Sequence, residues 1–171
     1  MRRGNAGAAG LVVAGLLLAL PFGAAAAGAL DALSVFSGTF RGKGRVTFSD
    51  GRPAEAVVCR TTGRIAGAVF RISGRCGGGN RSGTFSIQVR ASGNGYLGTW
   101  TSSTTKGAVA FSGSGRDGTF SFRPSGAASD TARLDSLVIR SLSDKRYTLS
   151  ARGQDLAKKV SGSLQVTFRK R

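Results

Sequence analysis

Histidine is absent from this chain, and acidic residues are scarce, with only 8 Asp and Glu among 171 residues. The absence of histidine excludes Ser-His-Asp and Cys-His nucleophiles, and it removes the commonest general base and a common metal ligand. Paired-carboxylate chemistry would have to use these few acids, of which Asp50 and Asp117 suit turns. Ser-Lys chemistry has residues available, but no spacing singles out a pair. We therefore expect a non-catalytic protein without a cofactor or a metal site.

A long hydrophobic run is also missing. The apolar stretch Leu11–Leu20 has about ten residues, whereas a transmembrane helix needs ~20. It follows Arg2 and Arg3, and a small-residue tract that ends at Ala29 offers Ala-x-Ala sites for a signal peptidase. We expect residues 1–29 to be a cleaved signal peptide. The mature chain, residues 30–171, would then be periplasmic or secreted, with no membrane span after cleavage.

Cysteine is nearly absent, since Cys59 and Cys76 are the only two. In an exported chain an oxidising compartment favours a disulfide between them. If residues 58–64 and 69–75 form a hairpin that turns near Gly67, the two cysteines lie opposite each other across its open end. A pair of inert buried thiols is the alternative. Two cysteines without histidine make a zinc site hard to build.

Basic residues are abundant by comparison. The chain has 25 Lys and Arg and a formal net charge of +17, and cleavage removes only Arg2 and Arg3, which leaves +15. Such a field favours anionic partners but does not determine the fold. A GC-rich genome also produces an excess of Ala, Gly and Arg, so a merely solvated basic surface is the alternative.

Apolar and polar residues alternate with a period of two along the mature chain. In residues 36–48 the Phe, Gly and Val positions share one face, and the Ser, Thr, Arg and Lys positions share the other. The same alternation returns in residues 70–73, 85–90, 120–123 and 160–169. One face of each strand is therefore expected in a core, where the Phe side chains and Trp100 would fill the interior.

Turn residues separate these segments. Asp50-Gly51, residues 77–80, Asn94-Gly95 and Asp117-Gly118 suit the positive-φ positions of hairpins. We expect a long loop over residues 124–130 and a turn or short helix over residues 154–159. Because an antiparallel meander must protect its edges, we predict an all-β antiparallel meander closed into a small barrel of about eight strands, as a single domain over residues 30–171. A β-sandwich is the alternative.

A transmembrane barrel would show the same alternation, with its apolar side facing lipid. It would need girdles of Tyr and Trp at both interfaces, and this chain has two Tyr and one Trp. The last apolar residue, Phe168, is followed by three basic residues. The pattern therefore favours a barrel with its polar face in water.

Four segments of the chain contain a Gly-x-Gly-x-Val strand, a cysteine pair and a Gly-x-Trp strand, and they are Phe40–Val46, Glu55–Arg60, Gly74–Cys76 and Tyr96–Trp100. In these motifs the chain resembles small secreted alphaproteobacterial proteins of unknown function. In architecture the chain is similar to lipocalins and avidins, whose Gly-x-Trp lies on a barrel strand. The resemblance implies a small barrel and no particular activity.

The leading functional interpretation is an exported envelope protein whose basic face binds an anionic envelope polymer, such as lipopolysaccharide or an acidic polysaccharide. The planar arginine side chain suits phosphate and carboxylate groups. The candidate polyanion-binding residues are Arg41, Lys43, Arg45, Arg60, Arg71 and Arg75. Nucleic acid would bind the same charges in vitro, but export makes it a poor physiological partner.

Two other functions remain open. A carrier with a small hydrophobic ligand inside the barrel would require a cavity, whereas the many inward Phe side chains predict a filled interior. An inhibitor of an extracytoplasmic enzyme, such as lysozyme, is the other. Lysozymes are usually basic, so a strongly basic partner would be repelled.

We predict that protein recovered from cells begins at Leu30 and contains a Cys59–Cys76 bridge. Intact mass spectrometry, with thiol alkylation in the absence of reductant, measures both properties. A mass that retains residues 1–29 would contradict the cleavage prediction, and two alkylated thiols would contradict the bridge.

Overall fold

The computed structural model describes residues 28, 30–79, 81–103, 107–125 and 132–171. The predicted signal peptide, residues 1–29, lies outside these ranges except for Gly28. Within them, a short 3-10 helix, η1 (Ser34–Phe36), precedes ten strands. The strands are β1 (Gly38–Phe48), β2 (Glu55–Ala66), β3 (Val69–Gly78), β4 (Arg81–Ser92), β5 (Gly95–Ser102), β6 (Ala108–Arg116), β7 (Thr119–Pro124), β8 (Ala132–Ser143), β9 (Arg146–Asp155) and β10 (Val160–Lys170).

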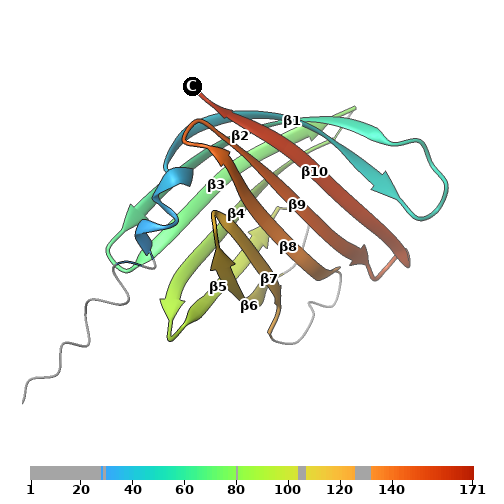
Figure 1. Ribbon diagram of the computed structural model, residues 1–171. Helices are drawn as coiled ribbons and strands as arrows, with labels where there is room; N and C mark the ends of the chain where they lie inside the picture. Colours follow the sequence, from blue (N-terminus) through green and yellow to red (C-terminus); the bar gives the residue numbers. More distant parts are fainter. Residues whose placement is uncertain (1–27, 29, 80, 104–106, 126–131) are drawn as a thin grey trace, which may run out of the picture.

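The strands form one closed antiparallel barrel in which each pairs with its neighbours in sequence, and β1 closes the ring against β10 (Figure 1). The predicted all-β meander barrel is therefore confirmed, and the sandwich alternative is wrong. The described strands number ten, compared with the expected eight or so. Register shifts at Leu134/Ser136 and Ser141/Ser143 interrupt the alternation of β8.

Most of the predicted turns are in place. Asp117 and Gly118 both have positive φ, 48° and 71°, and Gly51 has a φ of 79°. The turn predicted at Asn94-Gly95 is one residue too late, because Gly95 already pairs with Ser92 in the β4–β5 ladder. Strand β9 continues to Asp155, so the predicted turn after it is confined to residues 156–159. The long loop predicted over 124–130 lies mostly outside the described residues.

Glycines on the inner face of β1 let the barrel close. A Cβ atom at Gly42 would lie 2.6 Å from side-chain atoms of Phe168 and Val166 on β10. At Gly44 a Cβ would collide with the Gln165 carbonyl oxygen. Because β10 passes so close, a side chain at either position would force the closing strands apart.

Aromatic side chains fill one end of the barrel, called here the closed end. The helix η1 lies at this end beside β2 (Figure 1). Its residue Phe36 is fully buried. The Phe36 ring centroid lies 5.5 Å from that of Phe120 and 5.3 Å from that of Tyr147, both in edge-on contacts. Leu30 and Leu33 are buried beside it. The packed core of the closed end thus includes the first residue of the predicted mature chain, Leu30.

A buried hydroxyl pair lies within this packing. The Tyr147 and Thr61 hydroxyl oxygens are 2.9 Å apart, and Tyr147 also stacks on Phe168. Burial raises the pKa of Tyr147 well above its ordinary value, although the hydrogen bond to Thr61 acts in the opposite direction. The phenol is therefore neutral in the folded barrel.

No described helix has both the length and the apolar character needed to cross a membrane.

We expect Phe120→Ala to lower the free energy of unfolding by ~3–5 kcal/mol, because it removes a fully buried ring from the closed end. Phe48→Ala, at the half-buried opposite end of β1, should cost less. Chemical denaturation of both variants measures the difference. Equal midpoints for parent and Phe120→Ala would contradict the packing.

We also expect the barrel to lose stability as pH rises above about 10, because Tyr147 ionises in the unfolded chain but not in the fold. The contribution of Tyr147 to stability is fully present below the pKa of the unfolded chain and is lost as the pH rises from there toward the raised pKa of the fold. Denaturation at about pH 8 and about pH 11 should show a smaller loss for Tyr147→Phe than for the parent. An equal loss in both proteins would exclude this residue as the cause.

Candidate functional site

The opposite end of the barrel, called here the open end, encloses an apolar cavity of about 150 Å³. Its walls come from β2 to β5 and from β8 to β10, and include Phe85, Trp100, Leu137, Leu149, Leu164 and Val166. Its exposed lining is almost entirely apolar. The cavity is therefore suited to a hydrophobic group.

Small inward residues explain why space remains here. Ala151 and Gly153 alternate inward along β9, and Gly162 faces the same side on β10. At the closed end the equivalent positions of these strands carry Tyr147 and Phe168. The side chains thus become smaller toward the open end, and the interior widens.

The Cys59–Cys76 disulfide forms part of the cavity wall. The two residues are direct partners in the β2–β3 ladder, with Cα atoms 4.1 Å apart, and their sulfurs are bonded. The predicted pairing is confirmed. In the chain-entropy model a bridge that closes a loop of this length contributes ~3 kcal/mol. It joins two strands beside the cavity.

A wider mouth of about 390 Å³ adjoins the cavity, since Trp100, Leu134, Ala151 and Leu164 line both. Basic side chains surround this mouth. They are Arg52 from the β1–β2 turn, Arg81 from β4, Arg133 from β8, Arg152 from β9 and Lys158 from the β9–β10 turn. The apolar cavity therefore opens to solvent through a mouth whose rim is mainly basic.

Acidic partners neutralise part of this rim. Arg52 pairs with Asp50, with 2.6 Å between Nη2 and Oδ2, and its guanidinium lies 4.0 Å from the centre of the Phe48 ring. Lys158 and Asp155 are 3.8 Å apart. Arg133 pairs with Asp135 at 2.7 Å.

Arg81 differs from these three, because the described residues provide it with no ion pair. It shares the strand face of Phe85 and Ile87, the inward side of β4. Arg152 also has no ion pair within the described ranges, but it alternates outward and reaches the rim from outside. Arg81 is therefore the unneutralised cation that faces the mouth.

Hydrogen bonding to Arg52 lowers the pKa of Asp50 below its ordinary value, and the same contact raises the pKa of Arg52. Both groups are solvent-exposed, so the pair adds little to stability. The depressed pKa keeps Asp50 ionised as the pH falls, until acid protonates it and frees Arg52. The pair therefore holds the Arg52 guanidinium at the rim at neutral pH.

The predicted polyanion-binding residues all lie on the outer face of the barrel. Arg41, Lys43 and Arg45 alternate outward on β1 and are exposed, as expected. The remaining three, Arg60, Arg71 and Arg75, lie on the outer faces of β2 and β3. Register brings Arg41, Arg60 and Arg75 side by side across the three strands.

The predicted filled interior is right for the closed end and wrong for the open end. Phe36, Phe40, Phe70, Phe111, Phe120 and Phe122 are buried as expected. Phe85 and Trp100 are only partly buried and line the cavity instead, and Phe48 lines the mouth. The inward position of Arg81, four residues before the first apolar inward residue of β4, was the available signal for the mouth.

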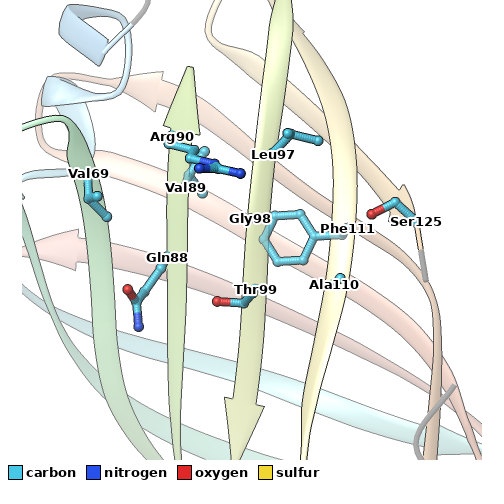
Figure 2. A pocket seen from close by; sticks show the side chains of 10 residues that line it. All are labelled: Val69, Gln88, Val89, Arg90, Leu97, Gly98, Thr99, Ala110, Phe111 and Ser125. Carbon is cyan, nitrogen blue, oxygen red and sulfur yellow. The ribbon is translucent and has the colours of Figure 1, made fainter. Parts of the chain in front are cut away.

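A separate hollow of about 310 Å³ lies on the barrel wall over β4, β5 and β6 (Figure 2). Gly98 lies at its centre, and the Phe111 ring covers this glycine in the view. The outward side chains around it, including Gln88, Arg90 and Thr99, are those of an ordinary solvated strand face. We assign no binding role to it.

Within the described part of the chain, no group of three or more acidic or cysteine side chains is placed to hold a metal ion. The described lining of the open end offers apolar contact and positive charge.

No family model matches the chain, and no curated protein matches it by sequence. Solved structures do match its fold. An S-type phycobiliprotein lyase from Guillardia theta is 12% identical with a TM-score of 0.62, and the match covers 83% of this chain and 92% of that one.

A protein of unknown function from the DUF3598 family, from Nostoc punctiforme, is 14% identical with a TM-score of 0.56. The match covers 81% of this chain and 49% of that protein, so this chain spans about half of its length. At these identities the likeness concerns the fold alone. The shared fold is a closed antiparallel β-barrel.

Proposed function

We propose that the open end of the barrel binds a small organic anion, with an apolar group in the cavity and the acidic group at the mouth. The observation that carries this proposal is the continuity between an apolar chamber and a rim that holds the inward, unneutralised Arg81. A hydrophobic ligand without a charge would leave this cation unused.

The chamber sets the size of the apolar group. A cavity of about 150 Å³ with hydrophobic walls is large enough for a benzene-sized group in other proteins. Trp100 and Phe85 supply aromatic walls for edge or face contacts with such a ring. A larger ligand would extend into the mouth, which is more than twice as large.

The rim sets the charge of the ligand. Arginine donates paired hydrogen bonds to carboxylate, sulfonate or phosphate oxygens, and a charge-assisted hydrogen bond is stronger than a neutral one. No described acidic side chain pairs with Arg81, so its N–H groups can bind the acidic group of a ligand. Arg52 is oriented by Asp50 and Phe48, so its guanidinium is already in place when a ligand arrives.

We further propose that the protein is an exported binding protein and not an enzyme. The absence of histidine and the engagement of Asp50, Asp135 and Asp155 in ion pairs support this, because no described carboxylate is left as an obvious acid or base at the cavity. The disulfide agrees with an oxidising, extracytoplasmic compartment. The phycobiliprotein lyase shares only the fold, so its reaction is not part of the proposal.

A pair of fluorescent dyes tests the proposal. Anilinonaphthalene sulfonate carries an anionic group, and phenylnaphthylamine has the same rings without it. We expect the sulfonate to bind about tenfold more tightly, because only it can engage the rim. Arg81→Gln should remove most of this advantage while leaving phenylnaphthylamine affinity within about twofold.

Two further variants complete the experiment. Ala151→Phe fills the cavity and should weaken both dyes, while the free energy of unfolding stays unchanged or rises by ~0.5–2 kcal/mol. Arg116→Gln makes the same charge change at the closed end and should alter neither dye. If Ala151→Phe leaves the affinities unchanged, the dyes bind elsewhere and the proposal fails.

A further inference from the structure

Barrel closure builds a row of five arginines on the outer face. Arg60 is the direct partner of both Arg41 and Arg75. On the other side, Arg41 faces Arg169, and Arg169 faces Arg146. The row therefore crosses β3, β2, β1, β10 and β9 at right angles to the strands, and all five side chains are exposed. We call these residues the arginine row.

The row spans roughly 19 Å, because neighbouring strands lie about 4.8 Å apart. Like charges directly opposite each other destabilise a sheet. The outward positions of these five strands include no acid, and none of the three described ion pairs involves a residue of the row. The repulsion is thus not relieved by the protein itself.

A hollow of about 620 Å³ lies over the centre of the row, on β1 and β10. Its lining includes Arg41 and Arg169, together with Lys43, Lys170, Arg171 and the Thr167 hydroxyl. Hydrogen-bond donors of charged groups therefore surround a groove that an anionic chain could enter.

We propose that the arginine row binds a linear acidic polysaccharide that runs across the strands. Such a polymer carries a carboxylate on successive sugars, at a repeat comparable to the distance between strands, so it can bridge neighbouring arginines. This site lies on the outer face, apart from the cavity, and the inference is independent of the proposed ligand at the open end.

The shape of the barrel favours a polymer over a membrane surface. The row follows the curvature of five strands around the barrel, so its ends turn away from any plane that touches its centre (Figure 1). A flat bilayer would contact only the middle arginines. A flexible chain can follow the curve and engage all five.

The test compares two variants with the same loss of charge. Arg41→Ser/Arg60→Ser/Arg169→Ser removes the centre of the row, and Arg90→Ser/Arg123→Ser/Arg140→Ser removes three exposed arginines from β4, β7 and β8. Titration with polygalacturonate at physiological ionic strength measures binding. We expect the row variant to lose affinity tenfold or more and the control to stay within about threefold.

Three outcomes overturn the proposal. Absence of binding by the parent does so directly, and equal losses in both variants would mean that affinity follows net charge alone. Duplex DNA, or vesicles of phosphatidylcholine and phosphatidylglycerol, bound by the parent as tightly as polygalacturonate would assign the row to another partner. If the proposal is right, the row variant should melt at a higher temperature than the parent in the absence of polymer, because it lacks the repulsion between arginines. Adding polymer should raise the melting temperature of the row variant less than that of the parent. Dye binding at the open end should be unchanged in the row variant.

Discussion

Strand β1 pairs with β10 along its length, from Phe40 opposite Lys170 to Phe48 opposite Gly162. This ladder joins the two ends of the meander, so it removes the edges that an open sheet would expose. It also requires the strands to approach closely, which the inward glycines of β1 permit. Once the ring is closed, every strand has one enclosed face and one solvent face. The cavity and the arginine row both depend on that closure.

Stability and space are divided between the two ends of the barrel. Interlocking aromatic rings around Phe36 and Tyr147 fill the closed end, and their burial stabilises the fold. At the open end small residues leave a chamber, whose walls lack that packing. The Cys59–Cys76 bridge ties β2 to β3 there. A covalent link thus stabilises a region that core packing supports less.

Basic side chains at the mouth and on the outer face differ in how far acidic residues neutralise them. At the mouth, acidic residues pair with Arg52 and Lys158. No described acidic residue pairs with Arg81, so its charge remains available to a ligand. On the outer face the strands from β9 through β1 to β3 provide no counter-charge. The net charge of +17 alone does not distinguish a discrete anion site from a continuous basic surface.

Local patterns in the sequence determined the strands, most turns and the disulfide, because alternation and turn residues act over a few neighbours, and the β2–β3 hairpin sets Cys59 opposite Cys76. The sequence also placed Arg41, Arg60 and Arg75 on solvent faces. It did not reveal that Arg169 and Arg146 continue their row, because that register depends on the pairing of β1 with β10, more than a hundred residues apart in the chain. The cavity was hidden for the same reason: whether inward side chains fill a barrel depends on which residues of distant strands meet at one level, and only the tertiary structure decides that.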